Sequence, residues 1–319
     1  MCHVPIINVE PLFSAAPAAE IDDAIRMACS EYGFMYLSGH GISSHLVTDL
    51  LAAINVYFSQ EDSIKNADAI SRSNYRGYIP QAFFTANDGQ GSPDNYEGYK
   101  LHAEISIDDP IRSMCGLYGP NIWPTSVPQL RGLVEKYWRE CDRVSDVLLR
   151  CFARLLDIDE QAFLGRFNNP LTNVTLLHYP AQTTQTTGIH PHKDTDVFTL
   201  LPPGCGGGLK IRPRGSAQWM SVRTSTDAIL LNIGDMMEVW SGGRFVSTPH
   251  MVVGRPGLAR HSFPYFCVPR YDAVIAPLVK PISGFERAIE TAGAISHQIW
   301  SSNWSDAAPI EVDLDPRAR

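Results

Sequence analysis

The 319-residue sequence lacks the marks of a membrane or secreted protein. No uninterrupted apolar run approaches the roughly 18 residues that a membrane-spanning helix needs. The first eight residues contain no basic stretch followed by an apolar segment, so they do not resemble a secretory signal peptide. We therefore expect a cytoplasmic protein with no membrane partner.

Basic clusters and paired cysteines are also missing. The formal net charge is -8, and an acidic chain without a basic block is poorly suited to bind nucleic acid. The seven cysteines are scattered, and no two form a C-x-x-C pair, so neither a disulfide framework nor a zinc–thiolate site is indicated. We expect reduced, mostly buried thiols. Nothing in the sequence indicates the oligomeric state.

The composition that remains is that of a folded protein, with 44% hydrophobic and 10% aromatic residues. Residues 1–170 are expected to be mostly helical, with a long helix after Pro124 in which apolar residues recur from Leu130 to Leu155. Ser126 and Gln129 have the spacing of a capping box for this helix. Residues 271–319 form a C-terminal extension, in which a helix over 284–300 is predicted.

From about residue 171 to 270, short runs rich in Val, Ile, Leu, Thr and Phe alternate with Pro, Gly and Asn. This texture predicts a β-sandwich or barrel, so the fold class is α+β, mainly β. A barrel with helices packed on it is one unit, and we expect residues 1–319 to form a single domain. The predicted strands are 174–179, 197–201, 208–211, 219–222, 229–233 and 261–268.

Three residues have the makeup of a metal site. His192 and Asp194 are two apart, and residues at that spacing on a strand project from the same face. His250 begins another apolar run and is a candidate third ligand from a neighbouring strand. Two imidazoles and one carboxylate form the facial triad of non-haem iron oxygenases, although zinc hydrolases also use such a set.

A basic residue further along the chain favours the iron alternative. A 2-oxo acid and O₂ would fill the open positions of the iron, and the distal carboxylate of 2-oxoglutarate would then need a cationic partner. Arg260 lies ten residues after His250 and enters an aromatic run, while Ser262 shares its face of the strand. An arginine fork binds a carboxylate through two hydrogen bonds. The competing interpretation of Arg260 is a surface ion pair.

These residues lie in segments that resemble the isopenicillin N synthase-like branch of the iron(II)/2-oxoglutarate-dependent oxygenases. The resemblance implies a double-stranded β-helix, or jelly roll, with Fe(II) held by His192, Asp194 and His250. It also implies that 2-oxoglutarate is bound by Arg260, Ser262 and Tyr179. The segments that carry it are 33–42, 76–78, 119–124, 176–180, 188–201, 232–235, 240–250 and 260–262.

The resemblance implies hydroxylation of a small-molecule metabolite, or its desaturation or cyclisation, with release of succinate and CO₂. Secondary metabolism is the expected setting, with ascorbate as a candidate reductant. Two alternatives stay open: an oxidase of the isopenicillin N synthase type that uses no 2-oxoglutarate, and a non-catalytic metal- or ligand-binding barrel. The residues suggested to contact substrate are Tyr99, Leu101, His102, Lys210 and Phe266.

One position departs from the family pattern. Asp196 stands where the family usually has glycine. Along a regular strand its carboxylate would point the same way as that of Asp194. The sequence leaves three roles open: lining the pocket, meeting a basic substrate, or pairing with Lys193 or Arg244.

Overall fold

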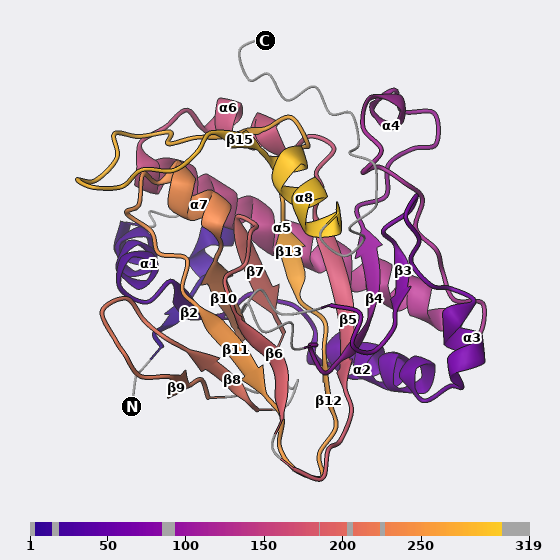
Figure 1. Ribbon diagram of the computed structural model, residues 1–319. Helices are drawn as coiled ribbons and strands as arrows, with labels where there is room; N and C mark the ends of the chain where they lie inside the picture. The colour runs from indigo at the N-terminus through magenta and orange to yellow at the C-terminus, as the bar shows by residue number, and fades with distance from the viewer. Residues whose placement is uncertain are drawn as a thin grey trace.

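The computed structural model describes residues 4–14, 19–84, 93–184, 186–202, 207–223 and 227–301. Two sheets make up the jelly-roll core, and in Figure 1 the small sheet lies in front of the large one. The small sheet has the strand order β6 (Thr187–His192), β11 (His250–Val253), β8 (Leu209–Ile211) and β9 (Met220–Ser221). The large sheet has the order β1 (Ile6–Asn8), β2 (Phe34–Ser38), β10 (Ile229–Ile233), β7 (Phe198–Leu201), β13 (Tyr265–Cys267), β5 (Asn173–Tyr179), β4 (Glu97–His102) and β3 (Gly77–Ile79), with β12 (Arg260–Ser262) also paired to β5.

Helices cover the outer face of the large sheet. The predicted long helix is α5 (Gln129–Leu156), which packs its apolar stripe against α2 (Ser44–Phe58) and β13. The predicted capping box is wrong, because the helix begins at Gln129 and its first turn has no side-chain cap. The other helical segments are η1 (Glu10–Phe13), α1 (Ala19–Glu31), α3 (Asp62–Asn66), α4 (Ile111–Met114), α6 (Glu160–Leu164), η2 (Gly165–Phe167), α7 (Asp235–Trp240) and α8 (Ala292–Ser301).

Strand β4 was not predicted, and its alternation decides which side chains face the interior. It pairs with β5 along its whole length, so that Lys100 lies opposite Thr175. The ring of Tyr99 points to the helices and meets the ring of Tyr57 at 5.0 Å. Because successive side chains of a strand alternate between its two faces, Lys100 and His102 point the other way, into the space between the sheets.

Two predicted elements have different boundaries. The predicted strand over 261–268 is divided into β12 and β13 at Pro264, which has no N–H to donate to the sheet. The pairing with β5 nevertheless keeps its register across the break. The predicted closing helix over 284–300 begins only at Ala292, because Glu290 and Thr291 pair as β15 with β14 (Val274–Ile275).

The expectations on thiols and membrane spans can be compared with the described residues. Five cysteines there are buried free thiols: Cys29, Cys115, Cys141, Cys151 and Cys267. Cys2 and Cys205 lie outside the described residues. No helix among the described residues has both the length and the apolar character needed to cross a bilayer.

Candidate iron and co-substrate site

The small sheet supplies the two histidines. Strand β6 ends at His192 and β11 begins at His250, and the two residues lie directly opposite each other. Asp194 is in the loop after β6, so the prediction that it shares a strand with His192 is wrong. The loop still returns its carboxylate to the histidines, and Oδ1 of Asp194 lies 3.6 Å from Nε2 of each.

Backbone carbonyl groups fix the tautomer of both rings. Nδ1 of His192 lies 2.8 Å from the carbonyl of His190, and Nδ1 of His250 lies 3.2 Å from that of Thr248. A carbonyl oxygen only accepts, so each Nδ1 carries the proton and each Nε2 is left as a free electron-pair donor. Burial lowers the pKa of His250 to about 4, which keeps this ring neutral.

These donors fit a divalent iron. One carboxylate oxygen and two imidazole nitrogens lie within 4.8 Å of one another. Both rings present an unprotonated nitrogen to the same point. A neutral imidazole pair with one carboxylate is the donor set that non-haem iron(II) prefers, and it leaves positions open for other ligands.

The large sheet holds the other oxygen of Asp194. Oδ2 accepts hydrogen bonds from Thr199 Oγ1 at 2.5 Å and from Asn232 Nδ2 at 2.7 Å. Burial alone would raise the pKa of Asp194, but His250, His192 and these two donors lower it. The loop carboxylate is thus fixed from strands β7 and β10, with Oδ1 turned toward the histidines.

Asp196 adds a further link to this arrangement. Its carboxyl is buried, and its Oδ2 lies 2.8 Å from the same Thr199 hydroxyl. Burial and the nearby Asp194 raise the pKa of Asp196 well above its ordinary value. A hydroxyl has one proton to give, so a protonated Asp196 can donate to Thr199 while Thr199 donates to Asp194.

A buried carboxylate on α7 anchors the loop from the other side. Glu238 is 3% exposed and contacts Lys193 at 3.1 Å, Arg214 at 3.3 Å and Arg287 at 3.0 Å. Arg244 donates to the carbonyl of Ser241. The suggested pairing of Asp196 with Lys193 or Arg244 is therefore wrong.

The candidate co-substrate residues form a second cluster on β12 and β5. Arg260 lies opposite Tyr179, and its guanidinium carbon is 4.6 Å from the centre of that ring. Nη1 of Arg260 donates to Oγ of Ser262 at 3.3 Å. All three side chains are at most 9% exposed. No carboxylate of the described residues pairs with Arg260, so the surface ion pair considered from the sequence is not formed within them.

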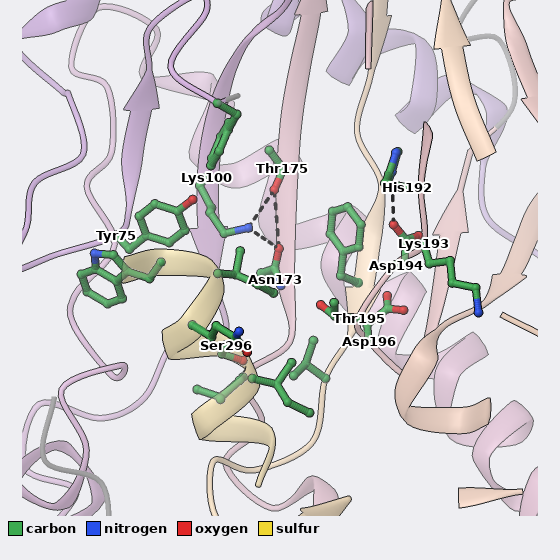
Figure 2. Close-up of a pocket in the computed structure, with 18 of the residues that line it drawn as sticks. Tyr75, Lys100, Asn173, Thr175, His192, Lys193, Asp194, Thr195, Asp196 and Ser296 are labelled. Atoms are coloured by element: carbon green, nitrogen blue, oxygen red, sulfur yellow. Dashed lines mark hydrogen bonds and ion pairs between the residues drawn. The ribbon is translucent and has the colours of Figure 1, made fainter. Parts of the chain in front are cut away.

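A cavity of about 870 Å³ lies in front of the metal ligands. Figure 2 shows His192, Asp194 and Asp196 on one side of it and Lys100, Asn173 and Thr175 on the other. Helix α8 forms part of its wall, with Ile295, Ser296, Gln298, Ile299 and Trp300.

Of the five residues suggested to contact substrate, two line the cavity and three do not. His102 and Phe266 line the cavity. Tyr99 and Leu101 are fully buried in the core on the helix side of the sheet, and the hydroxyl of Tyr99 donates to the carbonyl of Ile122. Lys210 lies on β8 and is not among the lining residues.

Sequence reasoning missed Lys100. The two residues chosen beside His102 were Tyr99 and Leu101, although only Lys100 has the two-residue spacing that puts it on the same strand face as His102. The two-residue spacing of Lys100 and His102 in this strand was the available signal. Other lining residues that were missed are Tyr75, Asn173, Thr175 and Trp300.

Comparison with known proteins agrees with this site. The family model of the 2OG-Fe(II) oxygenase superfamily matches residues 171–269, and one described as non-haem dioxygenase in morphine synthesis N-terminal matches residues 4–126. The chain is 31% identical over 274 residues to the 2-oxoglutarate-dependent dioxygenase thnC of Trichoderma harzianum, covering 81% of this chain and 82% of that protein. It is also 31% identical over 267 residues to azadirone synthase LFS of Melia azedarach, covering 79% and 78%.

A solved structure has the same fold. A full-length Neurospora crassa protein in complex with alpha-KG and thymine superposes with a TM-score of 0.77 at 20% identity, covering 94% of this chain and 97% of that one. The chain belongs to the 2OG-Fe(II) oxygenase superfamily. It is an iron(II)/2-oxoglutarate-dependent dioxygenase.

Proposed function

We propose that the protein hydroxylates a C–H bond of a small organic metabolite and forms succinate and CO₂ from 2-oxoglutarate. The observation that carries the proposal is the position of Asp194 Oδ1, 3.6 Å from the free Nε2 of both His192 and His250. Desaturation or ring closure of the substrate would use the same site. The two relatives reported above, a dioxygenase of Trichoderma harzianum and azadirone synthase of Melia azedarach, support a role in secondary metabolism.

Iron held by these three residues would supply the oxidising chemistry with O₂ and 2-oxoglutarate. The chain's own residues orient the three metal ligands and exclude water from the site. Thr199 and Asn232 hold the outer oxygen of Asp194, and the carbonyl groups behind both rings keep each Nε2 free. Ligand groups held in place by their neighbours bind metal more tightly than mobile ones.

Arg260 and Ser262 are proposed to bind the distal carboxylate of 2-oxoglutarate. Both are buried next to Tyr179, whose ring lies against the guanidinium and restricts its orientation. A bidentate pair with an arginine is favourable where water is excluded and no other carboxylate competes for it. We further propose that residues 1–319 act as one unit, because strands from both halves of the chain share the large sheet.

The test is formation of succinate from 2-oxoglutarate by protein reconstituted with Fe(II), with and without ascorbate, in the presence of pooled metabolites. Turnover should require O₂ and iron and should be lost in His192→Ala and Arg260→Ala. O₂ consumption without 2-oxoglutarate would instead indicate an oxidase of the isopenicillin N synthase type. Visible absorption under argon gives a second measurement, because 2-oxoglutarate bound to Fe(II) should produce a charge-transfer band.

A further inference from the structure

The cavity wall opposite the metal ligands is basic. Lys100 points into it from β4, and Arg76 lines it from the segment before β3. His102 lies beside Lys100, and burial lowers the pKa of His102 well below its ordinary value, so its ring is neutral. Lys100 Nζ lies 2.9 Å from Asn173 Oδ1 and 3.4 Å from Thr175 Oγ1, and both are neutral partners. Within the described parts of the chain, no carboxylate forms a salt bridge with Lys100 or Arg76. Arg76 is buried and Lys100 is partly buried. Removing a cation from water without a negative partner is costly, so a bound anion would stabilise both groups.

The acidic residues of the cavity do not supply it. Asp94 pairs with His190 at 2.8 Å, and Asp235 lies 3.6 Å from Lys193. Asp196 contacts Thr199, as described above. These carboxyl groups have partners of their own, and among the described residues none of them forms a salt bridge with Lys100.

The pairing of the large sheet places the basic wall and the metal site on one surface. Asn232 pairs with Thr199, Thr199 with Phe266, Phe266 with Asn173, and Asn173 with His102. Directly paired residues project from the same face of a sheet. This row of side chains therefore crosses five strands, from Asn232 and Thr199, which bind Asp194, to His102, which lies beside Lys100 on β4. At about 4.8 Å per strand, Thr199 and His102 are roughly 14 Å apart.

Aromatic side chains, together with aliphatic ones, line the cavity, and two of the rings lie close to Lys100. Tyr75, Phe84, Tyr96, Phe266 and Trp300 line the cavity, and Trp300 of α8 stacks on Tyr75 at 5.1 Å. The ammonium group of Lys100 lies 5.7 Å from the ring centre of Tyr75 and 5.8 Å from that of Phe266. Flat side chains of this kind favour a flat apolar ligand, and the single cationic end favours a negative group on it.

We propose that the substrate is an aromatic carboxylic acid whose carboxylate binds Lys100, with its oxidised carbon at the other end of the cavity. This inference rests on the proposed function, since it names the substrate of that site. Asn173 and Thr175 orient the ammonium group toward the cavity. The guanidinium group of Arg76, which also lines the cavity, adds to the attraction for an anion.

The test compares aromatic carboxylic acids with their primary amides, which keep the shape and lose the charge. Binding of each pair is measured by isothermal titration calorimetry under argon, with Mn(II) and saturating 2-oxoglutarate so that the Arg260 cluster is occupied. We expect at least one acid to bind about tenfold or more tightly than its amide, because hydrogen bonds to a charged group are the stronger kind.

Three variants assign this preference to Lys100. Lys100→Met should remove it, while Lys100→Arg should keep it and guard against a folding defect in the methionine variant. Lys136→Met, at an exposed position of α5, is the matched control and should behave as wild type. Acids that bind no better than amides, or a preference that Lys100→Met leaves intact, would overturn the proposal.

A separate measurement keeps this proposal distinct from the proposed function. The charge-transfer band of Fe(II) with 2-oxoglutarate should appear in wild type and in Lys100→Met alike. If the band forms and the acids show no preference, only the substrate inference fails. If no band forms in wild type, the proposed function fails instead.

Discussion

Thr199 and Asp194 join the two sheets of the core through a hydrogen bond of 2.5 Å between a hydroxyl and a carboxylate oxygen. Thr199 lies on a strand of the large sheet, whereas Asp194 lies in the loop that follows a strand of the small one. The bond therefore fixes a loop residue against a rigid element. Its consequence is the direction of Oδ1, which faces both histidines.

Thr199→Val should weaken metal binding without abolishing the fold. The change removes the hydroxyl and leaves Asn232 as the donor to Oδ2 of Asp194. Loss of such a supporting partner lowers metal affinity by about 10- to 100-fold. Fe(II) or Mn(II) titration under argon measures it, with Thr48→Val on the exposed face of α2 as the control. Wild-type affinity in Thr199→Val would show that the bond has no orienting role.

Arg260→Lys should raise the KM for 2-oxoglutarate by about tenfold or more, since lysine keeps the charge but lacks the planar fork. Metal affinity should not change, because Arg260 contacts Ser262 and Tyr179 rather than the three ligands. Succinate formation at varied 2-oxoglutarate concentrations gives the KM. Arg255→Lys, at an exposed position, serves as the control. An equal KM in Arg260→Lys and wild type would contradict the assignment of the co-substrate site.

Glu238→Gln should destabilise the protein by about 1.5 kcal/mol, because it replaces a buried carboxylate that accepts charged hydrogen bonds from three cations, and these cations stay partly solvated. Chemical denaturation at neutral pH measures the free energy of unfolding. Glu135→Gln removes one partner of a solvent-exposed pair with Arg131 and should have a much smaller effect. A similar loss in both variants would mean that the Glu238 cluster does not anchor the loop.

Binding of an aromatic acid should weaken as the pH rises through about 8. Burial and the nearby Arg76 lower the pKa of Lys100 to about 8, so the ammonium group is charged below this pH and neutral above it. Besides Arg76, the groups around the ammonium group of Lys100 are His102, Asn173, Thr175 and the rings of Tyr75 and Phe266. Because the acid stays ionised throughout, its affinity is greatest below pH 8.

The pH dependence is measured as kcat/KM for the acid, which should fall up to tenfold per unit above pH 8. Lys100→Arg should remove this decline, because arginine stays charged. The corresponding amide should show no such decline in wild type. A decline shared by the amide and by Lys100→Arg would point to another titrating group.

The sequence alone determined the elements with strong local periodicity and the types of ligand. The apolar repeat from Leu130 to Leu155 predicted α5, and the run Ile229–Ile233 predicted β10 to the residue. His192 and His250 were expected on neighbouring strands, and the structure pairs them directly. These features follow from residue type and spacing, which the sequence displays without any long-range information.

The tertiary structure alone decided which side chains meet. Asp194 reaches the histidines from a loop rather than a strand, because Thr199 and Asn232 of the other sheet hold its outer oxygen. Lys100, and not Tyr99, faces the cavity because pairing with β5 fixes the register of β4, and a shift of one residue would exchange the two faces. Such contacts join residues far apart in the chain. The spacing of Lys100 and His102 places them on one face of a strand, but only the pairing with β5 decides that this face meets the cavity.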